Sequence, residues 1–114
     1  MLLIDAANVV GSRPDGWWRD RPGAARRLVE RLRAATAIER PITVVLEGRA
    51  TAGAPEGEVD GVRVVHAPGD GDDTLAALAT AGVTLVTADR GLAERARDNG
   101  AAVVGPRSLL ERLD

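Results

Sequence analysis

Acidic side chains recur along this sequence just beyond short apolar runs. Asp5 follows the run Met1-Leu2-Leu3-Ile4 directly, which places a charge against a segment that is expected to be buried. The other acids of this kind are Glu47 after residues 42–46, Asp70, Asp72 and Asp73 beyond residues 62–65, and Asp89 beyond residues 83–87. Two carboxylates about 5 Å apart repel each other by roughly 3 kcal/mol at an effective dielectric constant of about 20. If several of these acids converge, they need either protons or a cation.

The composition narrows the kind of cation that such a cluster would bind. The chain has no cysteine and one histidine, so the ligands are oxygens, which suit Mg²⁺ or Mn²⁺. Such an ion activates water and neutralises the charge that builds up on a phosphoryl group. The acids therefore predict cleavage of a phosphate ester. Taken singly, most of them also have a simpler interpretation, with Asp72, Asp73 or Asp89 as a helix cap and Glu47 as an exposed turn residue.

Five apolar runs predict the strands that would position these acids, at residues 1–4, 42–46, 62–65, 83–87 and 101–104. The intervening sequence predicts helices at about 20–35, 75–79, 90–99 and from Pro106 onward. Turn-forming residues predict loops at 9–20 and 49–60, the second of them mobile. Strands that alternate with helices indicate an α/β domain with a mainly parallel sheet. Because parallel strands end at one shared edge, the acids are expected to meet there.

The bulk properties set limits on the class of protein. The 114 residues are enough for one domain, residues 1–114. All 15 basic residues are arginines, which excludes Schiff-base chemistry and a phosphate-loop lysine. The net charge of −2 does not by itself indicate nucleic-acid binding, although seven arginines precede residue 35. No run is long enough to span a membrane, and we expect a cytoplasmic protein.

Three motifs that combine acidic and polar residues follow one another along the chain. They are Leu2-Leu3-Ile4-Asp5-Ala6-Ala7-Asn8-Val9, Gly71-Asp72-Asp73-Thr74, and Val86-Thr87-Ala88-Asp89-Arg90-Gly91-Leu92. On these motifs the chain resembles the PIN-like nucleases, and within them the NYN-domain branch, over essentially its whole length. The resemblance implies a three-layer α/β/α sandwich with a mainly parallel five-stranded sheet in the order 3-2-1-4-5. It also implies a metal-dependent endoribonuclease that uses Mg²⁺ or Mn²⁺ and an activated water.

The resemblance also assigns roles to individual positions. Asp5, Asp72, Asp73 and Asp89 would be catalytic, and the metal ligands would come from Asp5, Asp72 or Asp73, and Asp89. Glu47 stands where relatives often carry Asp, and it is a further candidate ligand. Asn8 would orient Asp5 or contact the substrate, and Thr87 and Arg90 would hold a phosphate, a task for which the planar guanidinium is well suited.

The two tryptophans and the histidine each allow two interpretations. Trp17 and Trp18, flanked by Arg13 and Arg19, could form a stacking surface for unpaired bases, with Arg13 and Trp17 contacting the substrate. Alternatively, one tryptophan packs against the sheet and the other is partly exposed. His66 could assist proton transfer near the acids, or it could have a structural role.

Three functions are consistent with the acids. The first is an endoribonuclease with RNA as its partner and no association with membranes. The second is a nucleotide phosphohydrolase that attacks, for instance, a nucleoside triphosphate. The third is a non-catalytic module that binds RNA or a protein. The sequence leaves open whether the chain forms a homodimer.

Overall fold

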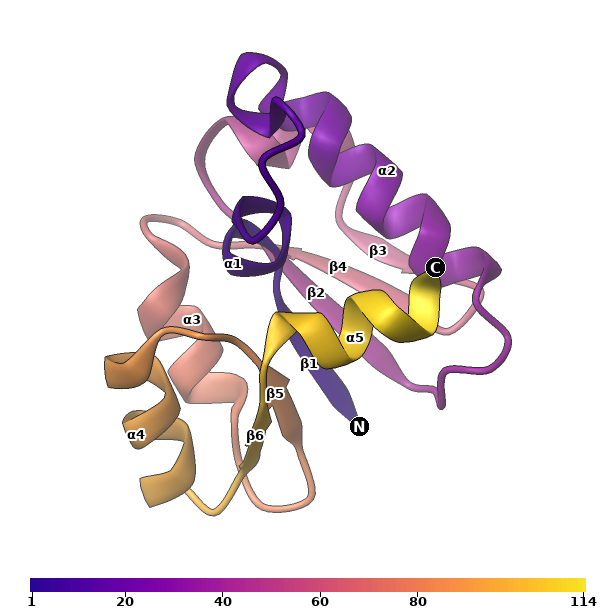
Figure 1. Ribbon diagram of the computed structural model, residues 1–114. Coiled ribbons are helices and arrows are strands. Elements are labelled where there is room, and N and C mark those ends of the chain that lie inside the picture. The colour runs from indigo at the N-terminus through magenta and orange to yellow at the C-terminus, as the bar shows by residue number, and fades with distance from the viewer.

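A single sheet of six strands forms the centre of the computed structural model, which describes residues 1–114 (Figure 1). The strand order is β3-β4-β2-β1-β5-β6, and only β3 runs antiparallel to its neighbour. The strands are β1 (Leu2–Asp5), β2 (Ile42–Leu46), β3 (Gly57–Val59), β4 (Val62–His66), β5 (Thr84–Val86) and β6 (Ala102–Val104). The predicted α/β class with a mainly parallel sheet is therefore confirmed.

The prediction of five strands was wrong in strand count, and the sixth strand extends the predicted order 3-2-1-4-5 at one edge of the sheet. The additional strand, β3, lies at the edge of the sheet and pairs with β4. Asp60 and Gly61 join the two strands, and both have positive φ angles, of 54° and 76°, as a type I′ hairpin turn requires. The segment 49–60, predicted as a mobile loop, instead contains β3 and the 3₁₀ helix η2 (Gly48–Gly53).

Helices cover both faces of the sheet (Figure 1). The helices α1 (Ala6–Gly11), α2 (Arg21–Ala34) and α5 (Pro106–Leu113) pack on one face, where their apolar side chains join the larger of two core clusters. The helices α3 (Gly71–Leu78) and α4 (Arg90–Asp98) pack on the other face around the second cluster. The 3₁₀ helix η1 (Trp17–Arg19) precedes α2. The arrangement has three layers, with helices outside and strands between them.

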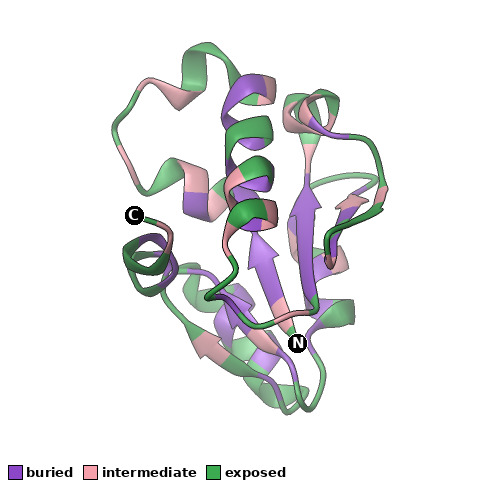
Figure 2. Ribbon diagram, turned by 90° about the vertical axis from the view of Figure 1, so that its right-hand side faces the viewer, coloured by how far each residue is buried: buried purple, intermediate pink, exposed green.

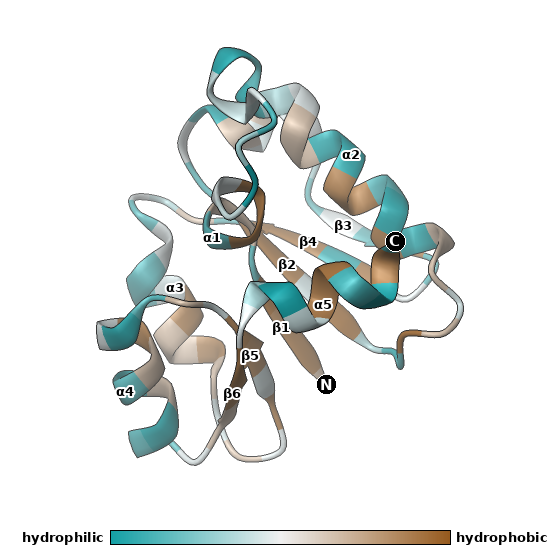
Figure 3. Cartoon of the chain, viewed as in Figure 1, coloured by the Kyte–Doolittle hydropathy of each residue, from teal (hydrophilic) through white to brown (hydrophobic).

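The central strands are buried on both sides, which explains their unbroken apolar sequences. In β1, Leu3 belongs to one core cluster and Ile4 to the other, and every residue of β2 is buried (Figure 2). Hydropathy follows the same layering, since the central strands are mainly hydrophobic while α4 and parts of α2 and α5 are hydrophilic (Figure 3). No helix combines the length and the apolar character needed to cross a membrane.

The segment after β1 differs from the predicted loop because a helix begins there at once. The carboxylate of Asp5 accepts a hydrogen bond from the backbone N–H of Asn8 and so caps the short helix α1. Six residues are too few for hydrophobic periodicity to reveal this helix in the sequence.

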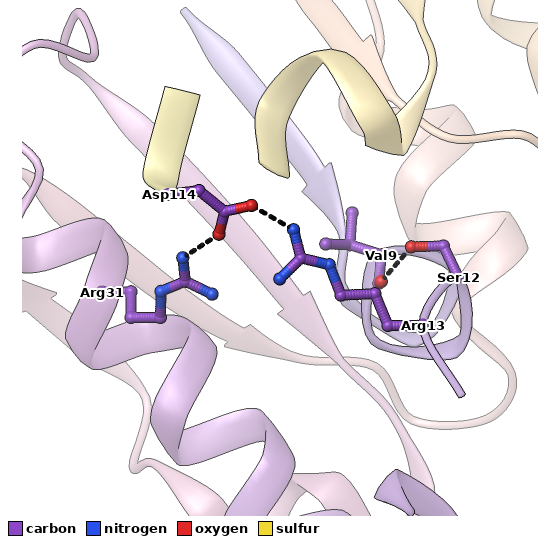
Figure 4. Close-up of polar contacts among 5 residues, drawn as sticks. All are labelled: Val9, Ser12, Arg13, Arg31 and Asp114. Atoms are coloured by element: carbon purple, nitrogen blue, oxygen red, sulfur yellow. Dashed lines mark hydrogen bonds and ion pairs between the residues drawn. The ribbon is translucent and has the colours of Figure 1, made fainter. Parts of the chain in front are cut away.

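Polar contacts between distant segments hold the helices of the larger cluster in place. Asp114 accepts hydrogen bonds from Arg13 and from Arg31, and these two ion pairs tie the end of α5 to the segment after α1 and to α2 (Figure 4). The guanidinium of Arg40 lies at the carboxyl end of α2, where it donates to five backbone carbonyls. These belong to Leu32, Arg33, Ala35, Ile38 and Asp60. Arg40 thereby satisfies carbonyls that a helix end leaves without partners.

Candidate active site

Asp5 lies at the carboxyl end of the central strand β1 and is only 6% exposed. One carboxylate oxygen accepts a hydrogen bond from the backbone of Asn8 at 3.3 Å, and the other accepts from the hydroxyl of Thr87 at 2.9 Å. Burial raises the pKa of Asp5; these two hydrogen bonds lower it, and the negative charges of Glu47 and Asp72 raise it further. No arginine forms an ion pair with Asp5. The chain thus buries a carboxylate without a positive partner.

The next site residues lie directly after the neighbouring strand β5. Ile4 pairs with Val86, so the residues that follow them, Asp5 and Thr87, lie side by side at the carboxyl edge of the sheet. The hydroxyl oxygen of Thr87 also accepts a hydrogen bond from the backbone N–H of Asp89 at 3.1 Å. Thr87 therefore connects the two acidic positions. This contact was not predicted; the family resemblance had implied a phosphate-binding role for Thr87.

Asn8 contributes a second connection between these segments. Its side-chain oxygen accepts a hydrogen bond from the backbone N–H of Ala88 at 2.7 Å. Asp89 caps α4 by accepting from the N–H of Leu92 at 2.9 Å, which is the simpler interpretation that the sequence allowed. The loop 87–89 is thus held against the end of β1 at several points, and the carboxylate of Asp89 is exposed beside it.

The amino end of α3 supplies the remaining acids. Asp70 is the cap of this helix, because its side chain accepts from the N–H of Asp72 at 3.1 Å; the prediction of Asp72 or Asp73 as the cap was wrong. Glu47 accepts from the N–H of Gly71 at 2.6 Å, and this bond joins the end of β2 to the start of α3.

Asp72 and Asp73, between which the sequence could not choose, have different surroundings. Asp73 is exposed and pairs with Arg95 at 3.0 Å. Asp72 is less exposed and lies within the electrostatic influence of the other acids. Burial raises the pKa of Asp72, and the charges of Asp89 and Asp70 raise it further, while Arg95 opposes them. The structure therefore brings Asp72, rather than Asp73, into electrostatic contact with Asp5 and Asp89.

The expected metal-binding set is not assembled in one place. No three Asp, Glu or His side chains converge closely enough to hold a metal ion. Of the four expected ligands, Asp73 pairs with Arg95, Glu47 binds the amide of Gly71, and Asp89 caps α4. The acids around Asp5 nevertheless carry the oxygen atoms that a hard cation prefers. Burial, and after it the charges of neighbouring acids, raise the pKa values of both Asp5 and Asp72.

A cavity of about 500 Å³ opens beside the acids, on the side of β2. Its lining includes Trp17, Arg21 and Glu47, together with residues of α1 and η2. The guanidinium of Arg21 lies 5.3 Å from the centre of the Trp17 ring. Trp17 is half-buried, whereas Trp18 is 51% exposed, so the two tryptophans have different surroundings. Arg21 was not identified from the sequence, because its position beside Trp17 depends on the turn at η1.

The remaining candidate residues lie on the β6 side of Asp5 or farther away from it. Thr87, Arg90 and Arg97 line a shallow hollow of about 360 Å³ on the side of β6. Arg13 pairs with Asp114 instead of pointing toward the acids. The ring of His66 is 2.7 Å from the carbonyl oxygen of Ala54, a contact that fits the structural interpretation of this histidine.

Comparisons with known proteins establish a similarity of fold only. No protein-family model matches the chain, and no curated protein matches it. The structure is similar to the crystal structure of Rae1 (YacP) from Bacillus subtilis, with 18% sequence identity and a TM-score of 0.76 over 99% of this chain and 72% of that chain. A mutant of the same protein gives 19% identity and a TM-score of 0.76 over 98% and 73%. At this identity the similarity establishes a common fold and leaves the chemistry to be argued from the residues.

Proposed function

We propose that this protein is a metal-dependent endoribonuclease of the PIN-like type. The observation that carries the proposal is the buried, unpaired carboxylate of Asp5 at the carboxyl end of the central parallel strand. A protein core tolerates such a charge poorly, so its retention at the edge where ligands bind in α/β folds indicates a functional role. Asp72 and Asp89 supply further negative charge beside it, as the PIN-like resemblance implies.

Asp5, Asp72 and Asp89 would hold the cation, with Glu47 beside them at the end of β2. When bound, Mg²⁺ or Mn²⁺ supplies an activated water and neutralises charge on the phosphoryl group. Thr87 and Asn8 orient the acidic segments through the hydrogen bonds described above. Arg90, exposed at the start of α4, would bind a neighbouring phosphate.

An extended substrate suits the surroundings of these acids better than a small one. Hollows lie on both sides of Asp5, one toward Trp17 and one toward Arg90. A nucleic-acid strand could occupy both hollows while its phosphate lies at the acids. This arrangement favours RNA over a free nucleoside triphosphate. No observation supports a homodimer, and the proposal does not depend on one.

A cleavage assay with matched variants tests the proposal. Single-stranded RNA labelled at one end is incubated with the protein in Mg²⁺, Mn²⁺ or EDTA, beside a parallel reaction with nucleoside triphosphates. We expect internal cleavage of the RNA that requires the metal and is abolished by Asp5→Asn. Hydrolysis of the nucleotides alone would instead identify a phosphohydrolase. RNA binding without cleavage under any metal condition would identify a non-catalytic module.

A further inference from the structure

We infer that the cavity beside Glu47 binds one unpaired base of the RNA, with a preference for guanine. The inference rests on the proposed function in taking RNA as the ligand. The cavity adjoins the acidic site directly, because Ala6 and Ala7, which follow Asp5, form part of its lining. A base held there would therefore belong to a nucleotide next to the phosphate at the acids.

The apolar lining of the cavity suits the faces of a base. Its volume of about 500 Å³ exceeds that of a single base, so that a nucleoside can enter. Val10, Ala25 and Ala50 make one part of the lining apolar, and the indole of Trp17 offers a flat surface. Unpaired bases of RNA are commonly bound by stacking on such aromatic rings. The guanidinium of Arg21, close to the same ring, adds a second planar group at the cavity.

The polar groups of the cavity determine which base fits best. Two carboxylates, from Glu47 and Asp70, line it, and ionised carboxylates only accept hydrogen bonds. They therefore repel a phosphate and favour a base that presents N–H donors. Guanine presents its N1–H and its amino group side by side, whereas uracil presents a single N–H. An ionised carboxylate has about four lone-pair sites, so Glu47 can accept two adjacent donors in addition to the N–H of Gly71, which favours guanine.

Glu47 is already oriented for this contact. One of its oxygens accepts from the N–H of Gly71 at 2.6 Å, which leaves the other oxygen free of hydrogen bonds within the protein. The bond fixes the side chain at the boundary between the cavity and the start of α3. Its position therefore does not have to be organised when the base binds.

Binding measurements in EDTA test this inference separately from cleavage. Fluorescence anisotropy compares labelled hexauridylate with the same oligomer carrying one internal guanosine. We expect the wild-type protein to bind the guanosine-containing oligomer at least about 10-fold more tightly, a difference within the range for one stacked and hydrogen-bonded base. Trp17→Leu should weaken binding of the guanosine-containing oligomer about 10-fold, and Glu47→Gln should remove most of the preference. Trp18→Leu, a change at the adjacent exposed ring, should leave both affinities unchanged.

The possible outcomes separate the two proposals. Equal affinities for the two oligomers, equal effects of the two tryptophan variants, or an unchanged preference in Glu47→Gln would overturn the assignment of the cavity. Circular dichroism of each variant establishes that it is folded, and Trp17→Phe, which retains an aromatic face, should restore most of the affinity. A protein that cleaves RNA but binds both oligomers equally contradicts this inference alone. A guanosine preference without metal-dependent cleavage contradicts the proposed function alone.

Discussion

The hydroxyl of Thr87 donates a hydrogen bond to the carboxylate of Asp5 across 2.9 Å, although 82 positions separate the two residues in the chain. The same hydroxyl oxygen accepts from the backbone of Asp89, so one side chain joins the ends of β1 and β5. Because Thr87 is buried, these bonds are shielded from water. The buried carboxylate is therefore oriented before any ligand binds.

Removing the hydroxyl of Thr87 should destabilise the protein. Thr87→Val keeps the shape of the side chain but leaves Asp5 with one hydrogen bond fewer, which raises the pKa of Asp5 still further. We expect a loss of about 1–3 kcal/mol in the free energy of unfolding at pH 7, measured with urea. Thr87→Ser, which keeps the hydroxyl, should recover most of the loss. Thr84→Val, at the other end of β5, should have little effect because the Thr84 hydroxyl makes no hydrogen bond within the protein.

Neutralising Asp5 should have the opposite effect on stability. The pKa of Asp5 is raised above its ordinary value of 3.8, mainly by burial, so the folded protein holds the proton more tightly than the unfolded chain. Ionisation of the Asp5 carboxyl therefore lowers the free energy of unfolding. This loss develops as the pH rises from below 3.8 through the pKa of Asp5 in the folded protein. Asp5→Asn should unfold at a higher temperature than the wild type at pH 7. In thermal melts the difference should shrink as the pH is lowered toward 3.5, and a less stable Asp5→Asn at pH 7 would contradict this interpretation.

The two adjacent aspartates of α3 should differ in their importance for cleavage. Asp72→Asn should reduce RNA cleavage at least about 100-fold, since it removes a metal ligand in the proposed site. Asp73→Asn, a chemically identical change one residue away, should reduce cleavage no more than about 3-fold because Asp73 pairs with Arg95 at the surface. Initial rates in Mn²⁺ compare the two variants. Equal losses in both would show that the assignment to Asp72 is wrong.

Arg40 should be among the most important charged residues for stability. Its guanidinium donates to five backbone carbonyls around the end of α2, and no other single side chain here replaces those contacts. Arg40→Met should lower the free energy of unfolding by about 2–4 kcal/mol, since several partly buried carbonyls lose a charged donor. Arg26→Met, at an exposed position on the same helix, provides the control and should change stability by less than about 0.5 kcal/mol.

The sequence predicted the parts of the fold that are buried on both sides. The runs at β1 and β2 were recognisable because parallel strands in the middle of a sheet are apolar throughout, whereas β4 was recognised from its valines although Arg63 is exposed. The strand β3 was missed because Glu58 and Val59 are exposed at the sheet edge and show no apolar run. The Asp60-Gly61 pair, a typical hairpin turn, was the feature that could have revealed it.

The candidate site was predictable in location but not in detail. Sheet topology alone places Asp5 and Asp89 at one edge, because parallel strands end together. The choice between Asp72 and Asp73 depends on where α3 begins, and a shift of one residue rotates each side chain by about 100° around a helix with 3.6 residues per turn. The roles of Thr87 and Glu47 depend on hydrogen bonds between segments that are distant in the chain, and residue spacing contains no information about these.

The most direct test of the acidic site is a crystal of the protein grown or soaked in Mn²⁺ and measured for anomalous scattering. The proposal predicts an anomalous peak between the carboxylates of Asp5, Asp72 and Asp89, with the side chains of Asp72 and Asp89 turned toward Asp5. The peak should be absent from crystals of Asp5→Asn. Occupied Mn²⁺ sites elsewhere on the protein with no peak beside Asp5, or a peak there that persists in Asp5→Asn, would contradict the claim that this buried carboxylate serves to bind a catalytic cation.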